Sequence, residues 1–66
     1  MKRYYFTLMD EDYNDLSALI PDGINKLTAV LRAKKWMREN GIKTAILQVN
    51  SLKTDDIIEH ITIASI

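Results

Sequence analysis

One amphipathic helix, roughly Asn25 to Asn40, constrains the fold of this 66-residue chain more than any other feature. The turn-forming run 21–23 precedes it and Gly41 follows it. Gly41 suits the left-handed backbone position just past a helix end, where a Cβ would cost energy. Ile42 then falls where a side chain packs back on the last turn, against Met37. The sequence therefore predicts both ends of the helix as well as its middle.

The apolar arc of this helix is unusually wide. At about 100° per residue, the helix places seven apolar side chains on a continuous surface. Its members are Leu27, Ala29, Val30, Leu31, Ala33, Trp36 and Met37. Because one sheet rarely covers so wide an arc, we expect its edges to meet a second surface.

Self-association is the support that remains open to so short a chain. A domain of this size buries only about 60% of the surface that its unfolded chain exposes, so it usually needs a disulfide, a metal or a partner subunit. The chain has no Cys and one His, which leaves the partner. We therefore expect a homodimer. The candidate interface residues are Leu31, Trp36, Met37, Ile63 and Ile66.

Two segments read clearly as strands. The aromatic-rich run from Tyr4 to Met9 places Tyr4, Phe6 and Leu8 on one side. The run 44–49 after the helix alternates in the same way. Its expected core residues are Ala45, Leu47 and Val49.

Three further elements are predicted from weaker signals. Residues 16–20 form a second strand with Leu16, Ala18 and Ile20 on one face, or residues 12–19 form a short helical turn. A strand there would be joined to 44–49 by a right-handed crossover and would pair with it in parallel. Thr54 is expected to cap a short helix through His60. Thr62 to Ile66 is then expected to be a last, short strand.

These elements add up to a single α+β domain over residues 1–66. We expect a small two-layer sandwich in a ββαβ-like order, with a three- or four-stranded mixed sheet, one main helix and a short C-terminal helix and strand. A single helix covers only part of such a sheet. A second copy of the chain would protect the remainder by edge pairing or by packing helices together.

Two patterns partly resemble chemical sites, and neither is favoured. Asp10, Asp12 and Asn14 fall at the first, third and fifth positions of a calcium loop, but the Gly and the closing Glu of that loop are missing. His60 would lie one helical turn after Asp56, and nothing in the spacing brings Ser51 or Ser65 to it as a nucleophile. We therefore expect no metal, no cofactor and no enzymatic activity.

Charge and composition favour a non-enzymatic protein-interaction module that acts as a homodimer. Nine basic and nine acidic residues cancel, so no global field steers the chain to nucleic acid or to an anionic membrane. The alternative is a nucleic-acid accessory protein that places Arg32, Lys35 and Arg38 on phosphates. A third, weaker class is a ligand-binding or catalytic dimer with its pocket at the subunit junction. The absence of Cys and of a long apolar segment favours the cytoplasm and no membrane.

Overall fold

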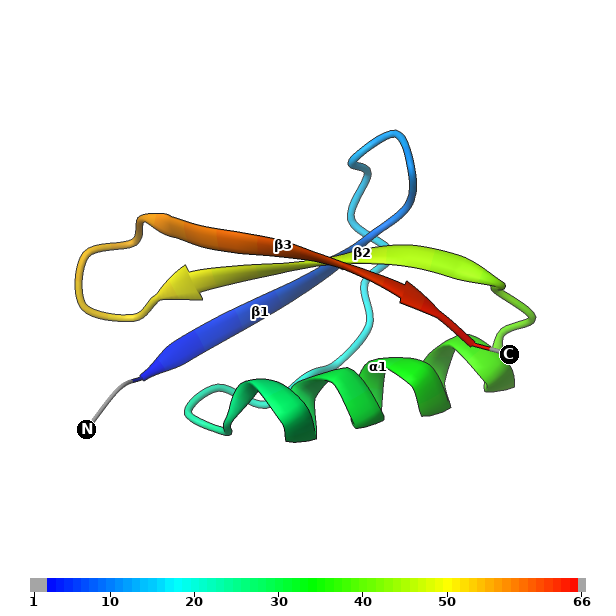
Figure 1. Cartoon of the computed structure of the whole chain (residues 1–66), viewed down its shortest axis with the longest axis horizontal. Coiled ribbons are helices and arrows are strands. Elements are labelled where there is room, and N and C mark those ends of the chain that lie inside the picture. The colour runs from blue at the N-terminus through cyan, green and yellow to red at the C-terminus, as the bar shows by residue number, and fades with distance from the viewer. Residues whose placement is uncertain (1–2, 66) are drawn as a thin grey trace.

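The computed structural model describes residues 3–65, which form a sheet with one helix against it. The elements follow along the chain as β1 (Tyr4–Met9), α1 (Lys26–Glu39), β2 (Thr44–Ser51) and β3 (Ile57–Ala64). β2 is the central strand and pairs antiparallel with β1 on one side and β3 on the other. α1 packs on one face, over β2 and β3 (Figure 1). The two-layer α+β prediction is confirmed, but the three-stranded sheet is antiparallel throughout and not mixed.

Both ends of α1 form as predicted. The Asn25 side chain accepts the N–H of Thr28 at 2.8 Å and so caps the first turn. Gly41 has a φ of 69°, and the N–H of Ile42 donates to the carbonyl of Met37 at 2.9 Å. This hydrogen bond, which spans six residues from Met37 to Ile42, is the one that ends a helix in a Schellman motif. Ile42 also packs against the core, as expected.

The core lies between α1 and the inner face of the sheet. Small side chains on the helix let it approach the strands closely, and longer side chains from the strands fill the space between them. The buried core comprises Phe6, Leu8, Ala29, Ala33, Met37, Ala45, Leu47, Val49 and Ile63. Full burial of each large aliphatic side chain stabilises the fold by about 1.5–3 kcal/mol. The inward alternation predicted for β1 and β2 is therefore confirmed.

Residues 16–20 form neither the predicted strand nor the alternative helical turn. The nearest ladder contact is an isolated bridge between Met9 and Asp15, just before this segment. Asp15 accepts the N–H of Ser17 at 2.7 Å, and Ser17 adopts a φ of 58°. A left-handed residue cannot continue a strand, so the local bond made by Asp15 ends the pairing.

The predicted alternation of this segment nevertheless survives without a ladder. Leu16, Ala18 and Ile20 are half-buried against the core, whereas Ser17 and Leu19 are exposed. The N–H of Leu16 donates to Leu8 and that of Gly23 to Tyr4, both at 2.9 Å. The segment thus runs along the outer edge of β1 and returns the chain to the start of α1.

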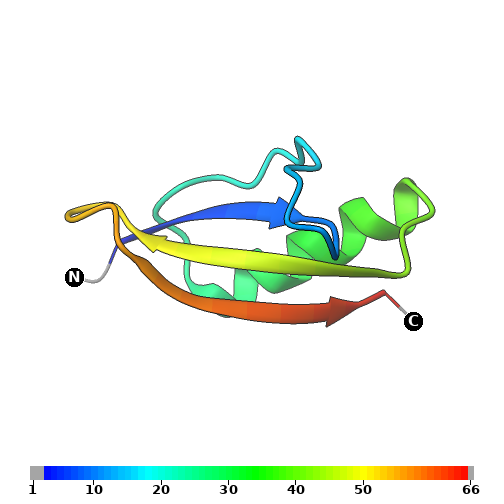
Figure 2. The same ribbon diagram turned by 90° about the horizontal axis from the view of Figure 1, so that it is seen from above.

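The predicted parallel crossover is wrong, because residues 16–20, which precede α1, do not form a strand that could pair with β2. The chain leaves β1, doubles back beside it, and only then begins α1. As a result α1 runs in the same direction as β1, and β2 returns antiparallel to both (Figure 2).

The predicted helix from Thr54 to His60 is also wrong, because residues 57–64 are β3. A tight hairpin joins it to β2. The Ser51 hydroxyl accepts the N–H groups of Lys53 and Thr54, and Asp55 takes a φ of 65°. The β-branched run that follows favours a strand paired with β2. Of the last predicted strand, 62–64 belongs to β3, and Ile66 lies outside the described residues.

The acidic loop after β1 lies on the sheet face opposite α1 (Figure 1). The Thr44 hydroxyl donates to Glu11 at 3.0 Å, which ties the loop to β2. The Tyr13 ring meets the edge of the His60 ring with centroids 5.7 Å apart, which ties it to β3. The chain's own loop therefore covers part of the outer face.

Candidate protein interface along the third strand

β3 forms an open edge of the sheet. β2 pairs with one side of it, and no described residue pairs with the other (Figure 2). Of its residues only Ile63 is buried and Ile61 half-buried; all the others are exposed. Exposed N–H and C=O groups along such an edge are a template for another strand.

The antiparallel ladder fixes which backbone groups of β3 face outward. Ser65 donates its N–H to Lys43 at 2.9 Å, so the Lys43–Ser65 pair is a hydrogen-bonded one. Hydrogen-bonded pairs recur at every second residue, which assigns 59, 61 and 63 to bonds with β2. The N–H and C=O groups of His60, Thr62 and Ala64 therefore point away from the sheet.

The start of β3 is irregular. Val49 pairs with Glu59 and Asn50 pairs with Ile57, which leaves Ile58 as the extra residue of a β-bulge. A bulge interrupts the regular alternation of outward groups. The regular part of the free edge is thus the stretch from His60 to Ala64.

Apart from the bulge at Ile58 and the charge of Glu59, both near its start, β3 carries none of the usual devices that keep edges apart. Its sequence contains no Pro, Lys or Arg, and Ile and Thr make up most of it. The opposite edge, on β1, is covered by residues 15–23, which bond to its carbonyl groups. The two edges of the sheet therefore differ, and only β3 is open to a partner strand.

The flank of α1 nearest β3 is apolar and exposed in its first turns, and Lys34 and Arg38 continue the same stripe toward the end of the helix. Lys26 forms an ion pair with Glu59, which places the start of α1 over β3. Because α1 is right-handed and runs in the direction of β1 (Figure 2), a turn of about 100° per residue swings Leu27 and Leu31 outward on the β3 side. Their exposed fractions are 70% and 57%. The open edge and this flank lie on the same side of the protomer and together form the candidate surface.

The residues predicted for an interface separate into three groups. Leu31 is exposed, and Trp36 is half-buried against the core. Met37 and Ile63 are buried inside the protomer, so its own packing already uses their side chains. Ile66 lies outside the described residues. The prediction missed the edge residues His60, Thr62 and Ala64, although the β-branched run that contains them was a usable signal.

The basic stripe of the alternative hypothesis lies on the outer side of α1. Arg32, Lys35 and Arg38 are all exposed. Two aromatic side chains that could stack on bases do not join this surface: Trp36 packs on the core, and the Tyr4 ring lies beneath the Lys26 ammonium, 5.3 Å away.

The expected pairing of His60 with Asp56 does not occur, because Asp56 precedes β3 and His60 lies within it, so no helical turn brings them together. His60 instead has Gln48 beside it, with 3.2 Å between the two Nε2 atoms. The Ser51 hydroxyl is used in the hairpin, and that of Ser65 donates to a backbone carbonyl at 2.7 Å. These hydroxyl groups have structural partners and are not placed as nucleophiles.

The calcium-like run serves the loop itself. One Asp10 carboxylate oxygen accepts the N–H groups of Asp12 and Asn14, each at 2.9 Å. The bond from Asn14 is the main reason that the pKa of Asp10 lies below its usual value. Within residues 3–65, no three His, Asp or Glu side chains come together as metal ligands.

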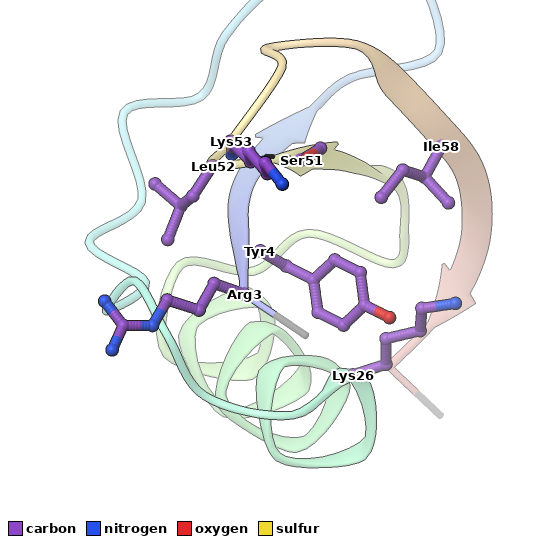
Figure 3. A pocket seen from close by; sticks show the side chains of 7 residues that line it. All are labelled: Arg3, Tyr4, Lys26, Ser51, Leu52, Lys53 and Ile58. Atoms are coloured by element: carbon purple, nitrogen blue, oxygen red, sulfur yellow. Dashed lines mark hydrogen bonds between the residues drawn. The ribbon is translucent and has the colours of Figure 1, made fainter. Parts of the chain in front are cut away.

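A hollow of about 750 Å³ opens beside the start of β3 (Figure 3). It lies where β1 and α1 begin and β2 ends. Tyr4, Leu52 and Ile58 give it apolar walls, and Lys26 and Lys53 carry charge into it. The hydrogen bond that Lys26 donates to Glu59 raises the pKa of Lys26, so this ammonium stays charged.

Comparison with family models, curated proteins and solved structures finds no match to this chain. Among residues 3–65, no helix has the length and apolar character needed to cross a bilayer.

Proposed function

We propose that this protein is a small, non-enzymatic interaction module of the cytoplasm whose first partner is a second copy of itself. The observation that carries the proposal is the open, unprotected edge of β3. Pairing of two β3 strands would join two sheets into one six-stranded sheet. Edge pairing of this kind uses main-chain bonds for affinity and side chains for selectivity.

Symmetry limits the register of such a pair. A two-fold axis perpendicular to the sheet keeps each side chain on its own face, and directly opposed residues must share a face. The axis must therefore pass midway between one residue of β3 and the same residue of the partner subunit, which pair directly. Centring on Thr62 also opposes His60 to Ala64 of the partner subunit. All three outward-facing residues then bond, giving about six backbone hydrogen bonds.

The side chains suit this register. Thr62 would face Thr62 of the partner subunit across the axis, a pairing that is favourable in antiparallel sheets. On the inner face, Ile61 would lie beside Ile63 of the partner subunit. Glu59 would face Ser65 of the partner subunit, so no like charges are opposed.

Backbone bonds alone fall short of the cost of association over most of its range. At a net 0.5–1.5 kcal/mol each, about six bonds supply roughly 3–9 kcal/mol. Association costs an estimated 4–15 kcal/mol in lost freedom of motion. Burial of further apolar surface must supply the difference.

The exposed flank of α1 offers that surface. Thr62 lies three residues beyond Glu59, or about 10 Å along the strand. At about 1.5 Å per residue, the same distance from Lys26 reaches residues 32–33 in the middle of α1, one to two residues beyond Leu31. Two helices lying over neighbouring β2–β3 pairs would be about 10 Å apart, which is within packing distance. We expect the two Leu31 side chains to meet near the axis.

Thr62→Pro tests the edge. Proline removes the outward N–H of Thr62 while leaving the bonds from 61 and 63 to β2, and edge strands tolerate it. We expect the unmodified chain to sediment at twice 7.6 kDa near 100 µM and Thr62→Pro at 7.6 kDa. The matched control Thr62→Val keeps the N–H and should remain dimeric.

Thr62→Lys tests the edge independently of the proline variant, whose fold the substitution itself could disturb. It keeps every backbone group and places two ammonium groups opposite each other at the axis, so it should also dissociate the dimer. Amide spectra of each variant would verify the fold. A monomeric unmodified chain, or a Thr62→Lys variant as dimeric as Thr62→Val, would refute the proposal.

A further inference from the structure

The hollow beside the start of β3 has the dimensions of a ligand site. Pockets for small molecules occupy about 300–1,000 Å³ and are mostly apolar with a few placed polar groups. The hollow, at about 750 Å³, lies inside that range. The Tyr4 ring, Leu52 and Ile58 form its walls (Figure 3).

The charges around this hollow have one sign. Arg3, Lys26 and Lys53 line it, and no carboxylate does. The whole chain is neutral, with nine residues of each sign, so this concentration of positive charge is local.

The start of α1 adds to the positive potential. Its first turn contains no acidic residue, and Lys26 is its first residue. A helix carries partial positive charge at that end, which acidic side chains commonly offset. Here the offset comes only from Glu59, which pairs with Lys26 on the β3 side.

We propose that the hollow binds a small amphipathic carboxylate. The apolar body of the ligand would lie against Tyr4, Leu52 and Ile58. Its carboxylate would pair with the Lys53 ammonium, while Lys26, already paired with Glu59, adds to the positive potential. A ligand with charge alone would leave the apolar walls without contact, and an apolar ligand alone would leave the Lys53 ammonium without a partner. The two halves of the site therefore select one ligand class.

Octanoate, kept below its micelle concentration, is a suitable probe for the isotope-labelled full chain. We expect saturable shifts of the Tyr4, Leu52 and Ile58 amide signals. 1-Octanol lacks the charge and inorganic phosphate lacks the apolar body, so neither should reproduce them. Lys53→Gln should weaken octanoate binding by roughly threefold, as loss of one exposed charge pair does.

Lys43→Gln is the matched control, because it removes an exposed lysine at the other end of β2. It should leave binding unchanged. Equal binding of octanol or phosphate, an unchanged affinity in Lys53→Gln, or no saturable shift would each overturn the assignment. The site lies in one protomer, so the Thr62→Pro variant should still bind octanoate. Loss of binding in that variant would also overturn it, whereas its retention separates this proposal from dimerisation.

Discussion

Three non-glycine residues in the left-handed region mark where regular structure stops. Tyr13, Ser17 and Asp55 have φ values of 64°, 58° and 65°. Beside each, an upstream side chain captures a backbone N–H: Asp10 near Tyr13, Asp15 at Ser17, and Ser51 just before Asp55. Short polar side chains compete with the sheet for backbone groups in this way. The loops are therefore specified by local bonds and not only by the lack of apolar residues.

Asp10 makes this local control dependent on pH. The N–H groups of Asp12 and Asn14 bond to its charged form, so its folded pKa lies below the ordinary 3.8. The unfolded chain binds the proton more readily, so the contribution of Asp10 to stability is complete above the unfolded pKa and is lost as pH falls through the folded pKa. Carboxyl titration by NMR should give a pKa under 3.8.

Asp10→Asn is the matched variant for that titration. The amide oxygen can still accept both N–H groups, but it cannot titrate. The amide shifts of Asp12 and Asn14 should follow the protonation of Asp10 in the unmodified chain and stay flat in the variant. A measured Asp10 pKa at or above 3.8 would mean that the loop bonds do not form in solution.

At the scale of elements, α1 was predictable because its end signals are local. Asn25 and Gly41 act within a few residues of the helix, and both behave as their types predict. The C-terminal motif also sets the direction in which the chain enters β2. It is therefore the point where a change of one residue should affect the stability of the whole fold.

Gly41→Ala should lower the free energy of unfolding by about 1 kcal/mol. The new Cβ would meet nothing within 4 Å, so the loss reflects only the left-handed backbone, whose φ is 69°. Gly41→Asn should cost less, because Asn tolerates that region. Urea unfolding of the three proteins measures the difference. Equal stability of Gly41→Ala and the unmodified chain would show that the helix ends in some other way.

β3 was mispredicted because two periodicities fit its sequence. Ile57, Ile58 and Ile61 form a stripe at helical spacing, and Asp55 and Asp56 resemble a helix start. Pairing with β2, which local sequence patterns do not reveal, favours the strand. The strand expected at 16–20 failed for the opposite reason, since a local bond at Ser17 overrode a correct alternation.

At the scale of the whole molecule, the sheet has two faces and two edges, and the chain itself covers three of these four surfaces at least in part. α1 covers the inner face, the acidic loop covers part of the outer face, and residues 15–23 cover the edge of β1. Only the edge of β3 has no cover among the described residues. The sequence predicts a homodimer with Leu31 among its contact residues, and the structure shows Leu31 exposed. It could not predict the edge itself, which exists only once the strand order is known.

The hollow, like the edge of β3, could not be predicted from the sequence. Arg3, Lys26, Ser51 and Ile58 come from four separate elements or their flanks. No spacing in the sequence joins them, and only the antiparallel order brings the beginnings of β1, α1 and β3 to one end of the sheet.

Cysteine scanning of the β3 edge tests the central claim most directly, because the chain has no Cys of its own. In the proposed register, Thr62→Cys lies opposite its copy within disulfide reach. His60→Cys and Ala64→Cys each lie about 13 Å from their copies. Under mild oxidation, we predict a covalent dimer from Thr62→Cys alone. Equal cross-linking at all three positions, or none at Thr62→Cys, would contradict the account.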